Sequence, residues 1–316
     1  MDAVRLKVSF DLSACEAPDN VKRTIKILKL KLVNTIIHTN ISLAVAAVLL
    51  TVSAQIQLGL KPDWHPYLFL VFVATLIKYN RHRLAILFAP DEAIHSGKHE
   101  LIRKNRKKFY FAALVLGIGF VIATISTKKE VLLTFLLLGF LTLFYSGPGF
   151  GMKKSNFKLR EIPYLKIFLI TAVWSVSTLL LPVIQDNGEI FSTQVLLLFS
   201  ERFFFIFAIA IQFDIRDTQA DHRAGLKTIP LLIGQNKAII LSYLSLSAGF
   251  LVSVFHYLTQ NERYILWALS ISFISTLTFF KLRYFRNRCL YYYQILDATL
   301  LLQGLLVLGF YFRNGN

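Results

Sequence analysis

Three aspartates follow directly on one of the most apolar stretches of the chain. The charge-free segment 203–213 reads FFFIFAIAIQF, and Asp214, Asp217 and Asp221 come after it. If the helix continues, successive residues turn by about 100° and the three positions lie within about 60° of one another. The three carboxylates then share one face. Carboxylate oxygens suit a hard cation such as Mg²⁺, which keeps several waters and often bridges to the phosphates of a substrate.

Basic residues are interleaved with these aspartates. Arg216, Arg223 and Lys227 supply donors for phosphate oxygens. The combination favours a metal–diphosphate site at the point where an apolar helix meets water. The alternative interpretation is a solvated loop, because mixed charges are ordinary at a membrane interface.

The elements that must position these residues are membrane helices. The 316 residues are 55% hydrophobic and 17% charged, whereas soluble proteins have roughly 45–50% apolar and about 25% charged residues. Many segments without Asp, Glu, Lys or Arg approach the ~20 residues that a spanning helix needs. These segments are 32–60, 64–77, 109–127, 131–152, 167–185, 203–213, 238–261, 264–280 and 298–312. We therefore expect an all-α, polytopic integral membrane protein with about nine transmembrane helices.

The distribution of positive charge predicts the orientation of the chain. With a cytoplasmic N-terminus, the loops on that side hold 26 of the 35 Lys and Arg residues, and the opposite loops hold 5. Positive charge collects on the cytoplasmic side of plasma and inner membranes. We expect the N-terminus inside, the C-terminus outside and the aspartates at the cytoplasmic face. The net charge of +17 is then an orientation signal, and no nucleic-acid partner is predicted.

The domain organisation predicted from the sequence is simple. Residues 1–31 form a basic cytoplasmic segment, and they lack the apolar core that a cleaved signal peptide needs. Residues 32–316 contain no linker and should form a single transmembrane domain. Cys15 and Cys289 both fall on the cytoplasmic side, where thiols stay reduced, so neither a disulfide nor a zinc site is predicted.

Two stretches resemble motifs of the UbiA superfamily of membrane prenyltransferases. Members share an aspartate motif followed by a basic residue, a glycine and a threonine, matched here by Asp214, Asp217, Asp221, Arg223, Gly225 and Thr228. The stretch LFYSGPGFGMKKSNF at 143–157 is similar to the tyrosine–proline–lysine loop of the superfamily, matched by Tyr145, Ser146, Pro148 and Lys153.

This resemblance implies a fold and a reaction. In the superfamily, helices surround a central cavity that opens to lipid, and carboxylates hold Mg²⁺ on the diphosphate of an isoprenyl donor. Loss of pyrophosphate leaves an allylic cation, which a lipophilic acceptor, often an aromatic quinone precursor, captures. Metal and cationic side chains stabilise the charge that develops on the leaving group, while the cavity keeps water from the cation.

The sequence departs from the first aspartate motif of the superfamily, which is roughly NxxxDxxxD on the second helix. Asn80 fits this motif, but Leu84 and Phe88 stand where the two aspartates would be, and Arg81 and Arg83 lie beside them. One interpretation is that transfer is retained with one Mg²⁺, because arginine can bind phosphate with two donors and replace the charge of a missing metal.

Two other interpretations stay open. The first is a catalytically inactive UbiA-like protein that binds a prenyl lipid or a quinone. The second is a lipid or small-molecule transporter, although a transporter is expected to place its site near the midplane of the membrane.

The candidate site residues follow from these arguments. Asp214, Asp217 and Asp221 are predicted to be catalytic and to bind Mg²⁺. The predicted substrate-binding residues are Asn80, Arg81, Arg83, Tyr145, Lys153, Arg216, Arg223 and Lys227.

The sequence also predicts where three further charged residues lie. Asp297 in the last helix should face the bundle and have a partner, because an aspartate at the centre of a spanning helix costs ~2.5–3.5 kcal/mol. Glu201 and Arg202 directly precede the segment 203–213, and we expect them at the outer interface.

Overall fold

A computed structural model of the chain describes residues 40–87, 106–146, 164–223, 225–281 and 295–314. Side chains are described in these ranges except at 81–87 and 143–146. Helices are the regular secondary structure of the described ranges, which contain no strand. In chain order they are α3 (Ile41–Gln57), α4 (Pro66–Leu87), α6 (Arg106–Ile125), α7 (Lys129–Ser146), α8 (Leu165–Gln185), α9 (Thr193–Arg223), α10 (Ile229–Ile233), α11 (Gln235–Thr259), α12 (Arg263–Lys281) and α14 (Leu296–Arg313).

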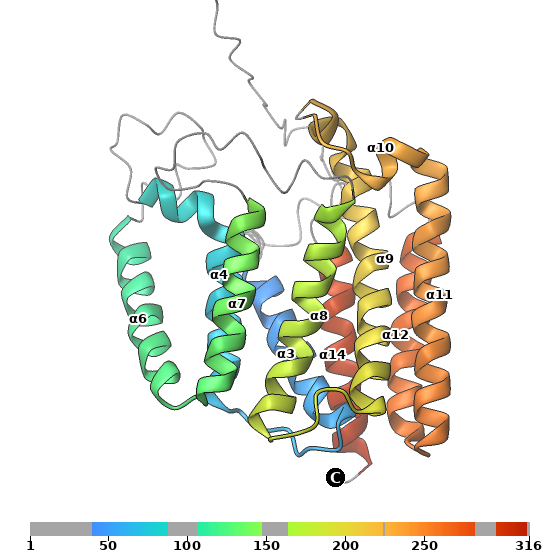
Figure 1. The fold of residues 1–316 in the computed structure, drawn as a ribbon, viewed down its shortest axis with the longest axis horizontal. Helices are drawn as coiled ribbons and strands as arrows, with labels where there is room; N and C mark the ends of the chain where they lie inside the picture. Colours follow the sequence, from blue (N-terminus) through green and yellow to red (C-terminus); the bar gives the residue numbers. More distant parts are fainter. Residues whose placement is uncertain (1–39, 88–105, 147–163, 224, 282–294, 315–316) are drawn as a thin grey trace, which may run out of the picture.

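Each charge-free segment of the sequence overlaps one long helix of this bundle. The long helices run side by side with alternating directions, so that α9 ends at the same end of the bundle at which α8 and α14 begin (Figure 1). We call this end the motif end. The short helix α10 also lies there (Figure 1). The basic segment 1–31 lies outside the described residues.

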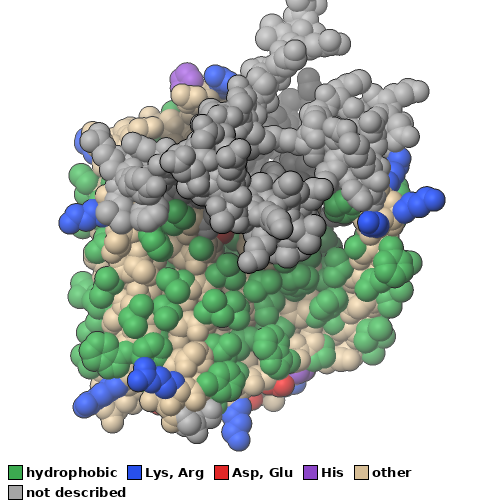
Figure 2. Space-filling model, turned by 180° about the vertical axis from the view of Figure 1, so that it is seen from behind, with side chains coloured by type: hydrophobic (Ala, Val, Ile, Leu, Met, Phe, Trp, Pro, Cys, Tyr) green, Lys and Arg blue, Asp and Glu red, His purple; other side chains and the backbone are tan. Residues whose placement is uncertain are grey.

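The prediction of an all-α membrane protein is confirmed for the described part of the chain. Six of its helices, α6, α8, α9, α11, α12 and α14, are long and apolar enough to cross a membrane. Shorter apolar helices occupy Ile41–Gln57 and Pro66–Asn80. Hydrophobic side chains cover the middle of the face seen in Figure 2, with Lys and Arg side chains near its lower margin and its sides. The count of nine spanning helices stays a prediction.

The helices differ strongly in how much of their surface is buried. Helix α9 packs against α8, α10 and α11, and its side chains join a core shared with α3, α11, α12 and α14. Helices α3 and α14 pack closely at Gly304, where an added Cβ would lie 2.7 Å from Leu49 Cβ. In contrast, α6 lies at one edge against α4 and buries Ala123 as its one buried residue. Its remaining surface is suited to contact with lipid.

Helix α9 is the longest helix among the described residues. It has 31 residues, a length of about 46 Å, whereas the hydrocarbon core of a bilayer is ~30 Å thick. The helix starts at Thr193 and carries Glu201 and Arg202 inside the bundle, where they are 0% and 1% exposed. Both side chains are therefore enclosed by neighbouring helices, and their depth near the outer interface stays a prediction.

Polar groups of α3 explain how this charged pair can be buried. The Arg202 guanidinium donates to Leu50 O at 2.7 Å, to Ser53 Oγ at 3.1 Å and to Gln57 Oε1 at 2.7 Å. Gln57 Nε2 in turn donates to Glu201 Oε1 at 3.2 Å. Hydrogen bonds of this kind offset the loss of hydration that burial of charge entails. The network fixes α9 lengthwise against α3 and thereby sets the height of the aspartates at its far end.

Candidate functional site at the motif end

The last three turns of α9 carry the three aspartates, and the chain then reverses. Gly225 has φ +70°, a left-handed conformation that glycine adopts without steric cost. The Leu226 N–H donates to Asp221 O at 2.9 Å, which closes the end of the helix. The reversed segment meets the start of α8, where the Tyr164 N–H donates to Lys227 O at 3.4 Å.

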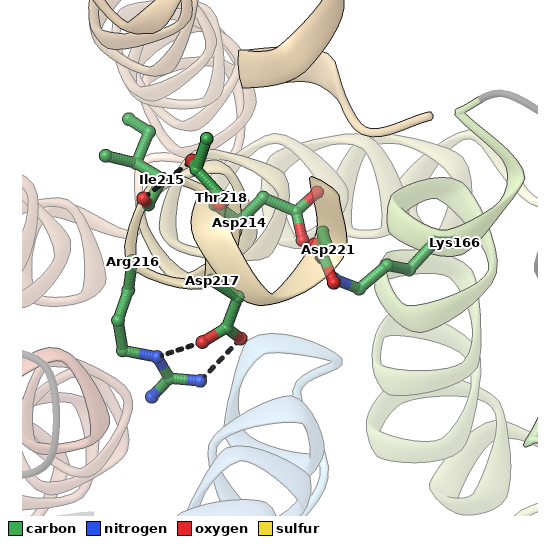
Figure 3. Close-up of polar contacts among 7 residues, drawn as sticks. All are labelled: Lys166, Asp214, Ile215, Arg216, Asp217, Thr218 and Asp221. Carbon is green, nitrogen blue, oxygen red and sulfur yellow. Dashed lines mark hydrogen bonds and ion pairs between the residues drawn. The ribbon is translucent and has the colours of Figure 1, made fainter. Parts of the chain in front are cut away.

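This contact places Lys166, in the first turn of α8, opposite the aspartates. Its Nζ lies 2.8 Å from Asp214 Oδ1 and 2.8 Å from Asp221 Oδ2 (Figure 3). All three side chains are largely buried, with 19%, 6% and 10% exposure for Lys166, Asp214 and Asp221. The two acids are seven residues apart, two helical turns, and they share a face as predicted. Sequence reasoning missed Lys166, although a lysine next to the charge-free segment 167–185 was a signal for it.

Asp217 points away from this group. Its carboxylate accepts hydrogen bonds from Arg216 Nε at 2.7 Å and from the second guanidinium nitrogen at 2.8 Å (Figure 3). The two side chains are 35% and 29% exposed. The Arg216 guanidinium also lies 5.0 Å from the centre of the Phe213 ring. The structure thus gathers two of the three aspartates, and no three His, Cys, Asp or Glu side chains of the described chain form a metal-binding group.

The structure describes the side chains of three of the other predicted site residues, Asn80, Arg223 and Lys227. Arg223 and Lys227 are exposed. Asn80, in α4, accepts a hydrogen bond from Asn40 Nδ2 at 3.2 Å and donates to Leu76 O at 3.0 Å. Lys153 and the side chains of Arg81, Arg83 and Tyr145 lie outside the described residues.

Asp297 also belongs to the motif end. It is the second residue of α14 and is half-buried. The positive charge that acts on it is that of Arg216, and its own charge acts on Tyr79 of α4. Tyr79 OH accepts a hydrogen bond from Trp174 Nε1 at 2.9 Å. Asp297 thus lies within electrostatic reach of side chains from two other helices, α9 and α4, and its expected pairing stays a prediction.

The chemistry of these residues fits Mg²⁺. The acidic side chains offer oxygen ligands, which Mg²⁺ prefers. Asp214 Oδ2 is buried and has no hydrogen-bond partner among the described residues, so this oxygen is available as a ligand for a cation. Lys166 already occupies the space between Asp214 and Asp221, and a metal ion that bound both acids would have to displace its ammonium group.

The fold and the acidic end of α9 place this protein among the helical membrane proteins that have a polar, acid-rich site at one end of the bundle. The chain belongs to the UbiA prenyltransferase family, whose model matches residues 102–289. The matched segment includes the aspartates of α9 but begins beyond Asn80, Leu84 and Phe88, where the first aspartate motif departs.

Comparison with solved structures agrees on the fold. The chain is similar to the apo structure of a UbiA homolog from Aeropyrum pernix K1, with 14% sequence identity and a TM-score of 0.55. The similarity covers 86% of this chain and 97% of the homolog. No curated protein sequence matches the chain.

Proposed function

We propose that this protein transfers an isoprenyl group from an isoprenyl diphosphate to a lipophilic acceptor, an aromatic compound or quinone precursor, at the motif end. The observation that carries this proposal is the placement of Asp214, Asp217 and Asp221 at one end of a UbiA-like bundle. Cationic side chains within 3 Å of all three acids accompany them. Such a mixture suits a diphosphate together with a divalent cation.

Each group has a separate role in this proposal. Asp217, Asp221 and Asp214 would hold Mg²⁺, which when bound neutralises charge on the leaving diphosphate. Arg223 and Lys227 are exposed and would bind phosphate oxygens as the donor enters. Arg216 would release Asp217 and turn to the diphosphate, because a guanidinium can pair with either partner. Asn80, Arg81, Arg83, Tyr145 and Lys153 are assigned to the same diphosphate by the resemblance of their sequence motifs.

The proposed orientation places the motif end in the cytoplasm. It rests on the excess of Lys and Arg in the loops on that side of the predicted topology. A water-soluble diphosphate head would then reach the site from the cytoplasm, while its isoprenyl chain stays in the apolar part of the bundle.

Binding of a donor analogue tests the proposal. The protein in detergent would be titrated calorimetrically with geranylgeranyl thiodiphosphate, first with Mg²⁺ and then with EDTA. We expect metal-dependent binding that is lost in Asp217→Ala and in Asp221→Ala. Glu189→Ala is the matched control, because Glu189 is an exposed acid beyond the opposite end of α8. Unchanged binding in both aspartate variants would rule out this site.

An inactive homologue is the second candidate, and two observations favour it. Leu84 and Phe88 replace the acids of the first motif, and Lys166 already pairs with two acids of the second motif. Such a protein would bind the thiodiphosphate or a quinone without turnover. Incubation with radiolabelled geranylgeranyl diphosphate and a panel of aromatic acceptors separates the candidates, since release of pyrophosphate occurs in the enzyme alone.

A further inference from the structure

Lys166 occupies a position in which a bridging cation would be expected. Its ammonium nitrogen is at the same distance, 2.8 Å, from one carboxylate oxygen of Asp214 and from one of Asp221. These acids lie two turns apart in α9, whereas Lys166 comes from α8, 55 residues away from Asp221 in sequence. The three side chains thus form a carboxylate–ammonium–carboxylate bridge between two helices (Figure 3).

The two acids can accept more than Lys166 donates. A pair of carboxylates has about eight lone-pair sites, while an ammonium group has three N–H donors. Asp214 Oδ2 is buried and unpartnered among the described residues, and Asp214 as a whole is 4% exposed. A buried carboxylate oxygen without a partner is costly. It therefore indicates a place where a further cation would be stabilised.

Lys166 is able to leave this position without disruption of the fold. Its backbone is held at the start of α8, next to the hydrogen bond between Tyr164 N and Lys227 O. Its side chain is 19% exposed, and a lysine reaches its charge through a flexible four-carbon stem. The ammonium can therefore swing towards water while the helix stays in place.

We propose that Lys166 is a built-in cation that competes with divalent metal ions for Asp214 and Asp221 and so sets the metal requirement of the site. With Lys166 in place, the two acids are neutralised by the protein itself. A metal ion binds them when the ammonium moves away, for instance onto the oxygens of a bound diphosphate. The role in diphosphate binding rests on the proposed function, whereas the competition with metal ions does not.

The test is a titration with Mn²⁺ alone, followed by electron paramagnetic resonance, on the full chain in detergent without any prenyl diphosphate. Lys166→Met keeps the length and bulk of the side chain and removes its charge, while Lys166→Arg keeps a cation. We expect Lys166→Met to bind Mn²⁺ at least tenfold more tightly than the wild type, and Lys166→Arg to remain close to the wild type. The gain should disappear in the double variant Lys166→Met/Asp221→Asn.

A purely structural ion pair gives a different result. Lys166→Met would then lower the melting temperature and leave Mn²⁺ affinity unchanged or weaker, which overturns the proposal. Lys166→Met could fail to fold in EDTA. Recovery of folded Lys166→Met during purification with Mg²⁺ would then support the proposal. If Mg²⁺ does not restore folding, and Lys166→Gln folds but binds Mn²⁺ no more tightly than the wild type, the proposal is refuted. Lys237→Met, at an exposed lysine of α11, controls for loss of positive charge. Because no prenyl diphosphate is used, failure here is distinct from failure of the proposed function.

Discussion

The buried residues Glu201 and Arg202 allow a stability prediction in which the two partners can be separated. Replacing Arg202 by methionine removes the donors to Leu50 O, Ser53 Oγ and Gln57 Oε1. It also leaves Glu201, which is 0% exposed, without the positive charge of Arg202 that acts on it. Leaving a buried charge without a compensating opposite charge costs about 3–5 kcal/mol. At roughly 2 °C per kcal/mol, the low end of the range for larger domains, Tm should fall by about 6–10 °C.

The measurement is thermal unfolding in detergent, followed by circular dichroism and by the loss of the monodisperse peak in size-exclusion chromatography. The double variant Glu201→Leu/Arg202→Met removes both charges. It should recover at least half of the loss, because an apolar pair of similar volume often replaces a buried ion pair at little cost. The control Lys237→Met, at an exposed position, should change the free energy of unfolding by less than about 0.5 kcal/mol. A double variant that is less stable than Arg202→Met would refute the reasoning, since the uncompensated charge would not then be the cause.

Three further outcomes can be measured in the same assay. Gly304→Ala should lower Tm, because its Cβ would lie 2.7 Å from Leu49 Cβ and 2.8 Å from the Leu49 carbonyl carbon, and overpacking of this kind costs about 1–3 kcal/mol. Gly309→Ala, in the same helix with open space around the position, should leave Tm unchanged or slightly higher. Tyr79→Phe removes the acceptor of the Trp174 indole N–H, so we expect a loss of about 0.5–1.5 kcal/mol and a shift in tryptophan emission.

The helices could be predicted from the sequence because their signal is local. The length of a segment without charged residues can be read from the sequence alone, and each such segment overlaps one long helix. The shared face of Asp214 and Asp221 was predictable for the same reason, since it follows from the period of the helix. The departure of Asp217 depends on the conformation of its neighbour Arg216, which spacing alone does not determine.

The parts that could not be predicted depend on residues far apart in the chain. The burial of Arg202 could not be predicted because its partners are Leu50, Ser53 and Gln57, about 150 residues earlier. From its neighbours in sequence alone, a charged pair beside an apolar segment indicates a membrane interface. The polar side chains of α3 that allow its burial are brought next to it only by the fold. Lys166 was missed for the same reason.

Two features of this protein lower the same electrostatic quantity, the negative charge that is free to bind metal ions. The acids of the first motif are replaced by Leu84 and Phe88, which removes carboxylates. Lys166 and Arg216 pair with the three aspartates of α9, and one negative charge is left over among these five groups. The first feature removes ligands that a metal ion would use, and the second places a cation of the protein where a metal ion would bind. A retained enzyme should therefore need a higher Mg²⁺ concentration while Lys166 competes for these acids, and Lys166→Met should lower the concentration that is needed. In an inactive homologue, the same variant gains metal affinity but no turnover, so metal binding and turnover measured on one variant decide between the two proposed functions.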